Sequence, residues 1–267
     1  MSMSKRHRPM DNPVRLHWLD PRDPNQPFPP PHKAMRDPNG LLAIGGDLSL
    51  ARLIRAYSTG IFPWYNPNEP ILWWCPDPRA ILLPHEIHVS RSLAKRIRRC
   101  DFAVTLDCAF ETVLEACAGE RANASGTWLG PDMRRAYLDL HGHGFAHSAE
   151  VWRDGALIGG LYGVALGRAF FGESMFSRAD DGSKLALYYL CRQLEAWQFS
   201  LIDCQIASAH LKTLGATDIP RERFLQQLRE SMQVPGRTGL WRYELDVPCD
   251  RRHRPARLAW PPLENAP

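Results

Sequence analysis

The sequence predicts an α+β fold in which a mixed sheet forms the main part of the chain. Asp154-Gly155 joins two long apolar segments and is a typical two-residue hairpin turn, so antiparallel strands are expected on either side of it. The helical segment 183–198 lies between two strands, in the order of a parallel crossover. The segment 32–80, which is compact and aromatic from residue 40, precedes these elements as a separate N-terminal unit.

The N-terminal part of the chain divides into a tail and this aromatic unit. Residues 1–31 are polar and rich in proline, so we expect an extended tail. Within 32–80, the spacing of apolar residues predicts a helix from Leu50 to Ser58. The tryptophan- and proline-rich segment 61–74 predicts an irregular aromatic unit rather than a regular element.

The main domain is expected over 81–246, where apolar runs alternate with turn signals. Strands are expected over 80–83, 103–106, 148–153, 156–166, 168–172 and 201–205. Helices are expected over 90–99, 109–118, 132–141, 183–198, 207–214 and 221–231. Residues 247–267 are rich in arginine and proline and predict a second tail.

Composition excludes several classes of protein. Hydrophobic residues make up 44% of the 267 residues, and no apolar run approaches the roughly 18 residues that a membrane-spanning helix needs. The N-terminus carries charges without the apolar segment of a signal peptide, so we expect a cytoplasmic protein. The seven cysteines include no CxxC pair, which favours reduced thiols over disulfides or a zinc ribbon. Nothing in the sequence indicates more than a monomer.

His141, His143 and His147 have a spacing that resembles a metal-ligand cluster. No ExxH motif or neighbouring cysteine supports that interpretation. Gly142 and Gly144 instead fit the end of a helix, where histidines often contact carbonyl groups. We therefore expect no metal site.

Basic residues cluster on one expected helix, although the net charge is only +4. Helical spacings of three and four place these residues on one side of the segment 90–99: Arg91, Lys95, Arg98 and Arg99. Such a run is often only a solvated face. Like charges held together repel one another, however, so a polyanionic partner such as RNA is the sharper hypothesis.

Two short polar clusters interrupt apolar, strand-like runs and form the candidate site: GESMFSR (172–178) and LIDCQ (201–205). Carboxylates and amides are costly to bury without partners, and each cluster is expected at a strand end, where parallel sheets bind ligands. Side chains alternate along a strand, so Asp203 and Gln205 face the same way, and Glu173 can reach the same cleft. A purely structural hydrogen-bonded network is the alternative.

Trp64 and Trp128 lie in loops that contain proline or glycine. Core packing explains most tryptophans in proteins. A platform on which a nucleobase stacks is the second interpretation of these two rings.

Seven motifs occur in order within residues 28–230: GLLAIGGDLS (40–49), GIFPW (60–64), LWWCPDPR (72–79), GTW (126–128), HSAEVW (147–152), GESMFSR and LIDCQ. Together they resemble the leucyl/phenylalanyl-tRNA–protein transferase family. The resemblance implies two domains, a small N-terminal domain over 32–80 and a GNAT-like acyltransferase domain over 81–246. It implies transfer of leucine, phenylalanine and, less, methionine from aminoacyl-tRNA to the α-amino group of proteins with N-terminal arginine or lysine. The product would enter the bacterial N-end rule pathway of degradation, and no ATP, metal or other cofactor would be needed.

The same resemblance implies roles for single residues. Gln205 would accept a hydrogen bond from the attacking amine, Asp203 would polarise Gln205, and Glu173 would lie in the aminoacyl pocket. The terminal adenosine of the tRNA would contact Trp64 and Trp128, and the basic face that includes Arg98 and Arg99 would bind the tRNA. The other expected substrate-binding residues are Leu161, Ser174, Met175, Leu190, Leu194 and Ile202, which leave the preference between leucine and phenylalanine open.

Two other functions are compatible with parts of the sequence. An acyl-CoA N-acetyltransferase needs a loop that binds pyrophosphate, and Asp180 and Asp181 would repel that group in the loop 177–182. A tRNA-binding protein without catalysis would leave the polar residues of the two clusters without a role.

Overall fold

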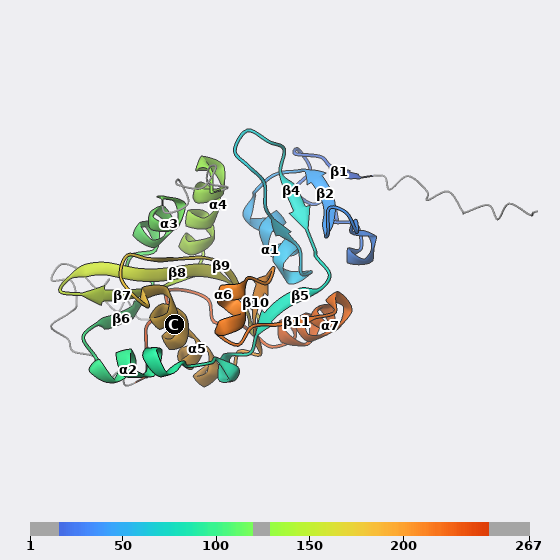
Figure 1. Ribbon diagram of the computed structural model, residues 1–267. Helices are drawn as coiled ribbons and strands as arrows, with labels where there is room; N and C mark the ends of the chain where they lie inside the picture. The colour runs from blue at the N-terminus through green and yellow to red at the C-terminus, as the bar shows by residue number, and fades with distance from the viewer. Residues whose placement is uncertain (1–15, 120–128, 246–267) are drawn as a thin grey trace, which may run out of the picture.

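The computed structural model describes residues 16–119 and 129–245, which form two β-sheets surrounded by helices (Figure 1). The smaller sheet has the order β1-β2-β4-β3, with β1 His17–Leu19, β2 Leu41–Gly45, β3 Phe62–Pro63 and β4 Leu72–Trp74. The larger sheet has the order β11-β5-β10-β9-β8-β7-β6. Its strands are β5 Arg79–Leu82, β6 Ala103–Leu106, β7 Ala146–Arg153, β8 Ala156–Leu166, β9 Ala169–Ser177, β10 Leu201–Gln205 and β11 Thr217–Ile219. The α+β class with a mixed sheet is thereby confirmed.

The helices are α1 Leu50–Ser58, α2 Arg91–Arg99, α3 Phe110–Gly119, α4 Pro131–Gly142, α5 Gly182–Ala196, α6 Ala209–Thr213 and α7 Arg221–Met232, with 3₁₀ turns at Pro31–Lys33 and Pro84–Glu86. The side chains of Ser49, Ser90 and Ser208 accept backbone N–H groups and so cap α1, α2 and α6. The cap at Ser208 explains why α6 begins later than the expected 207–214. No helix among the described residues has the length and apolar character needed to cross a membrane.

The smaller sheet differs from the sequence-based expectation at two places. Strand β1 lies within the expected tail 1–31, but it pairs in parallel with β2, and Leu19 is completely buried. The guanidinium of the buried Arg52 donates to carbonyl groups of the segment 20–26 and fixes that segment against α1. The segment 61–74, expected to be irregular, contains β3 and β4; the prolines around these strands concealed them. The expected C-terminal tail 247–267 lies outside the described residues.

The larger sheet is covered on both faces. Buried side chains of α1, α3, α4 and α7 form one core with one face, whereas α2 and α5 cover the opposite face with a second core (Figure 1). The hairpin predicted at Asp154-Gly155 joins β7 and β8, and both residues have the positive φ that such a turn requires.

The candidate site lies where the two parallel strands joined by the crossover β9–α5–β10 separate. Strands β9 and β10 pair in parallel from Ala169 opposite Leu201 to Phe171 opposite Asp203. Beyond this point β10 continues along β5, while β9 continues along β8 as far as Ser177. The expected strand 168–172 is therefore too short, because the long partner β8 extends it through the polar cluster. A gap forms where the two parallel neighbours part.

Candidate functional site

Glu173 occupies a β-bulge of β9. The register between β8 and β9 shifts between Gly172 and Ser174, which leaves Glu173 as the extra residue. Phe171 and Phe176 consequently pack into the same core, although an odd number of positions separates them. Bulges redirect side chains beside functional sites, and this one directs Glu173 into the gap between the strands.

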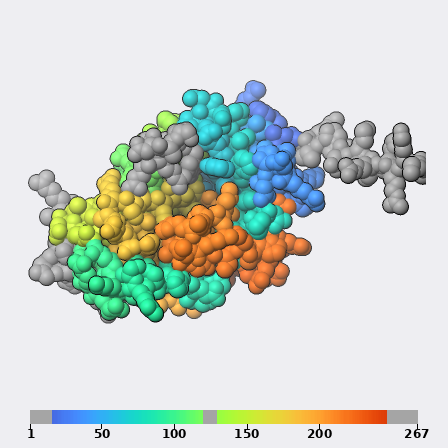
Figure 2. All heavy atoms as spheres, in the orientation of Figure 1, coloured from blue at the N-terminus to red at the C-terminus, as the bar shows by residue number. Residues whose placement is uncertain are grey.

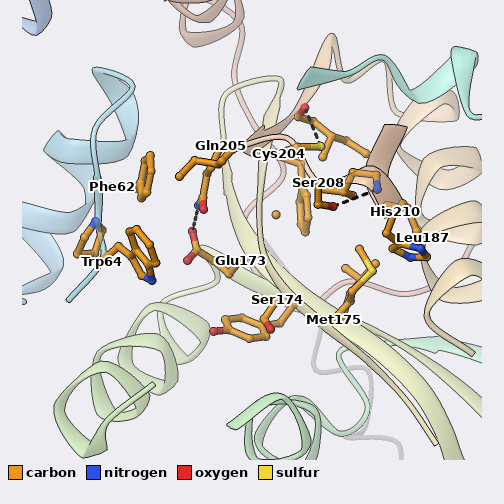
Figure 3. A pocket seen from close by; sticks show the side chains of 18 residues that line it. Phe62, Trp64, Glu173, Ser174, Met175, Leu187, Cys204, Gln205, Ser208 and His210 are labelled. Carbon is orange, nitrogen blue, oxygen red and sulfur yellow. Dashed lines mark hydrogen bonds between the residues drawn. The ribbon is translucent and has the colours of Figure 1, made fainter. Parts of the chain in front are cut away.

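Gln205 follows a second bulge, in β10. The register between β10 and β5 shifts between Asp203 and Gln205, with Cys204 as the extra residue. The backbone φ of Gln205 is +62°, in the left-handed region that residues other than glycine rarely adopt. The side chain points toward β9, and its Nε2 donates to Glu173 Oε1 at 2.8 Å (Figure 3).

Two phenols hold the carboxyl group of Glu173 from the other side. The hydroxyl of Tyr57, on α1, donates to Oε1 at 2.8 Å, and that of Tyr137, on α4, donates to Oε2 at 2.5 Å. Burial raises the pKa of Glu173 to about 7, against hydrogen bonds from the phenols that lower it. Burial and the nearby Glu173 raise the pKa of both tyrosines well above its usual value, so they stay protonated and remain donors.

Asp203 holds the backbone of Gln205, not its side-chain amide. Its buried carboxylate accepts from Arg79 twice, from Nε at 2.7 Å and from Nη2 at 2.6 Å. Its Oδ1 also accepts the backbone N–H of Gln205 at 2.9 Å. This corrects the expectation that Asp203 orients the amide. The bulge and the positive φ direct the side-chain amide of Gln205 toward Glu173, and the hydrogen bond to Glu173 orients this amide.

A cavity of about 360 Å³ opens beside the contact between Glu173 and Gln205. In Figure 2 a hollow lies between the blue-to-cyan part of the small domain and the yellow segment that contains β8 and β9. Apolar side chains from the larger sheet and α5 line the cavity: Leu161, Phe170, Met175, Leu187 and Ile202. Trp64, with 44% of its surface exposed, lines the cavity from the small domain, across from Met175 and Leu187 (Figure 3).

Comparison with known proteins identifies the family. The model of the leucyl/phenylalanyl-tRNA protein transferase family matches residues 81–229, and that of the N-terminal domain of the same family matches residues 46–77. The leucyl/phenylalanyl-tRNA–protein transferase of Alkalilimnicola ehrlichii is 54% identical over 90% of this chain and 93% of its own length. The corresponding protein of Nitrosomonas europaea is 54% identical over 83% of this chain and 94% of its own. The chain belongs to the leucyl/phenylalanyl-tRNA–protein transferase family.

This transferase therefore moves an aminoacyl group from tRNA to a protein. That activity sets aside both the acetyltransferase and the non-catalytic tRNA-binding alternatives. Among solved structures, L-PGS from Bacillus licheniformis is similar over 58% of this chain and 50% of its own, with 11% identity and a TM-score of 0.35. A GCN5-related N-acetyltransferase-like protein from Streptococcus suis is similar over 64% and 65%, with 15% identity and a TM-score of 0.29. The fold of the transferase is defined by its own strand order and not by these distant likenesses.

Two expected wall residues lie elsewhere in the transferase. Leu190 and Leu194 are buried in the core between α5 and the sheet and do not line the cavity. Leu187 is the α5 residue that reaches it. Leu190 and Leu194 follow three and seven positions later, which places them about 4.5 Å and 10.5 Å further along the helix axis. Leu161, Ser174, Met175 and Ile202 do line the cavity, and the substrate contacts of all six residues stay predictions.

The basic residues expected to bind tRNA lie outside the cavity. Arg91, Lys95, Arg98 and Arg99 are all on the exposed side of α2, and Arg99 forms an ion pair with Asp101 at 3.3 Å. Trp128 lies outside the described residues. No cluster that could hold a metal ion is found in the described ranges. His141 instead places Nδ1 2.8 Å from the carbonyl oxygen of Ala146.

Sequence reasoning missed several residues of the site. Tyr57 and Tyr137 look like ordinary core residues of helices, although a buried phenol usually finds a hydrogen-bond partner, which was the available signal. Arg79 begins an apolar strand, where a charged residue is unusual unless it is paired. Leu187 and the exposed His210, which also lines the cavity, gave no sequence signal.

Proposed function

We propose that this cavity is where leucine, phenylalanine and, less, methionine pass from aminoacyl-tRNA to the α-amino group of proteins with N-terminal arginine or lysine. The enzyme would act as a monomer in the cytoplasm and mark its products for N-end rule degradation. The observation that supports this proposal best is the contact between Gln205 and Glu173 at the edge of an apolar cavity. An amide beside an apolar pocket suits a reaction that joins an amine to an apolar acyl group.

The apolar cavity would receive the side chain of the aminoacyl group. Leucine, isoleucine, phenylalanine and methionine side chains make up much of its lining and favour an apolar side chain over a polar one. Burying a leucine or phenylalanine side chain contributes about 1.5–3 kcal/mol, enough to select against small residues. Met175 is unbranched and adaptable, which fits a pocket that accepts both branched and aromatic side chains.

Gln205 would bind the attacking amine. Its Nε2 is engaged by Glu173, so its Oε1 is the atom that accepts an N–H bond and orients the nitrogen lone pair toward the ester. A terminal α-amine has an ordinary pKa near 7.7–8.0, so little help is needed for proton loss. The aminoacyl ester is already activated, and holding both reactants together supplies much of the rate. Burial raises the pKa of the cavity thiol Cys204, which argues against a thioester intermediate.

Glu173 would select a basic acceptor. Asp203 is already neutralised by Arg79, whereas Glu173 receives only neutral donors from its three partners. Its charge is therefore the one within the site that is open to a cationic N-terminal side chain. Ionisation near pH 7 would make this selection stronger as the pH rises.

The tRNA would bind along two surfaces. The exposed ring of Trp64 at the cavity would stack on the terminal adenosine, an interaction of about 1–3 kcal/mol per base. The basic side of α2 would contact phosphates of the acceptor end. Phosphate contacts do not depend on the base sequence of the tRNA. Such recognition tolerates tRNAs with different bodies.

Transfer of radiolabelled leucine from Leu-tRNA to peptides that differ only at the N-terminus tests the proposal. Peptides beginning with arginine or lysine are expected to be labelled, and those beginning with glutamate or carrying an N-acetyl group are not. Equal labelling of the arginine and glutamate peptides would overturn the proposed selectivity. Gln205→Ala is expected to lower the rate strongly, with Ser200→Ala, at the opposite end of β10 from this contact, as the control.

A further inference from the structure

Arg79 is a completely buried arginine outside the residues assigned to the reaction above. Its guanidinium lies between two aromatic rings, 4.8 Å from the centre of Phe62 and 4.5 Å from that of Phe224. Phe62 belongs to the small domain and Phe224 to α7. The rings fix the plane of the guanidinium, so the direction of its N–H groups is set before any substrate binds.

The guanidinium in turn fixes Asp203. Two parallel hydrogen bonds, from Nε to Oδ1 and from Nη2 to Oδ2, leave the carboxylate a single orientation. In this orientation Oδ1 also accepts the backbone N–H of Gln205. A lysine would neutralise Asp203 equally well, but a single ammonium group has no planar pair of donors and would not hold the carboxylate plane.

Gln205 needs such support because its backbone is strained. A positive φ costs a residue other than glycine on the order of 1 kcal/mol, and it persists only where the surroundings impose it. The N–H accepted by Asp203 belongs to this same residue. If the carboxylate rotates, the bulge can relax and the amide leaves Glu173.

We propose that Arg79 is a positioning residue of the transfer reaction, which acts through Asp203 to keep the side-chain amide of Gln205 at Glu173 and ready for the amine. The proposal rests on the role of Gln205 given under Proposed function. It assigns Asp203 an orienting task rather than a proton-transfer task, since both of its oxygens are occupied by donors.

The test is a double-mutant cycle between Arg79→Lys and Gln205→Ala, measured as kcat and KM for Leu-tRNA with an arginine peptide. Alone, Arg79→Lys is expected to lower kcat by about 10- to 100-fold, the range that small misplacements of reacting groups produce. The KM for Leu-tRNA should stay within about twofold, because the cavity and α2 are unchanged. In the Gln205→Ala background, the same substitution should cause no further loss of kcat.

A matched control separates positioning from stability. Arg52 is also completely buried and paired with an aspartate, Asp47, at 3.0 Å, but it holds the segment 20–26 rather than the site. Arg52→Lys is expected to lower the thermal unfolding temperature without changing kcat. Phe224→Leu, which removes one ring from the guanidinium, is the milder second variant if Arg79→Lys does not fold. It is expected to lower kcat several-fold, again only when Gln205 is present.

The outcomes distinguish the two proposals. Equal losses from Arg79→Lys, or from Phe224→Leu, with and without Gln205 would show a merely structural role and overturn the inference. Unchanged kcat in Gln205→Ala alone would instead overturn the proposed function of Gln205. A rise in KM with unchanged kcat would place Arg79 in substrate binding and also contradict the inference.

Discussion

Burial and hydrogen bonding act in opposite directions on the pKa of Glu173. Burial favours the protonated form, while hydrogen bonds from two phenols and one amide favour the carboxylate. The balance places its pKa at about 7, where a modest change in one donor moves the charge across the physiological range. On the proposed role of Glu173, the phenols would therefore set the pH at which the site becomes selective for a cationic acceptor.

Tyr137→Phe is expected to shift the pH profile of the reaction upward. Loss of the hydroxyl removes a donor that lowers the pKa of Glu173, so the carboxylate forms only at higher pH. The rise of kcat/KM with pH for an arginine peptide should then have a midpoint above that of the native enzyme. Tyr188→Phe, on α5 and so on the opposite face of the sheet, should leave the profile unchanged, and a downward shift in Tyr137→Phe would contradict the argument.

One residue of helix α5 lines the cavity, and its neighbours on the same helix pack in the core. Leu187 lines the cavity, while Leu190 and Leu194 hold the helix against the sheet. Sequence periodicity identifies all three as one apolar side, because residues three or four apart lie on the same face of a helix. It does not tell which turn meets the cavity, since that depends on where β9 and β10 part.

Leu187→Ala is expected to enlarge the cavity and raise the preference for phenylalanine over leucine. Leu190→Ala is the matched variant: it should lower the free energy of unfolding by about 2–5 kcal/mol and leave the preference unchanged. The measurement is the ratio of kcat/KM for Phe-tRNA and Leu-tRNA, together with urea unfolding. A change of preference in Leu190→Ala but not in Leu187→Ala would contradict the assignment of the cavity wall.

The fold and the site could be predicted from the sequence to different extents. Local signals suffice for the hairpin at Asp154-Gly155 and for most helices, because turn residues and apolar spacing act within a few positions. The bulges at Glu173 and Cys204 depend on the register between strands, which no local pattern contains. The pair of Arg79 and Asp203 joins residues 124 positions apart, so only the assembled sheet brings them together.

At the scale of the whole molecule, two carboxyl groups with raised pKa values make the free energy of unfolding depend on pH. Glu150 accepts hydrogen bonds from Thr105 and Ser148 inside the sheet, and burial raises its pKa from 4.5 to about 7, as it does for Glu173. Between these values the folded protein keeps protons that the unfolded chain has released. The free energy of unfolding therefore decreases as the pH rises through this window.

Urea unfolding between pH 5 and pH 8 is expected to show this decrease. Glu150→Gln should make the slope shallower, because glutamine does not titrate, and the double variant with Glu173→Gln should make it shallower still. The absolute stability of the variants is not the measure, since an amide also changes the hydrogen bonds. A slope that is flat or positive in the native protein would contradict the raised pKa values.

The contact between Gln205 and Glu173 depends on groups from distant parts of the polypeptide. Tyr57 holds Glu173 from α1, and Phe224 holds Arg79 from α7. A chain still emerging from the ribosome lacks the last of these groups until residue 224 has been made and folded. On the proposed role of Arg79, copies that end before residue 224 would therefore transfer aminoacyl groups poorly and leave charged tRNA to translation.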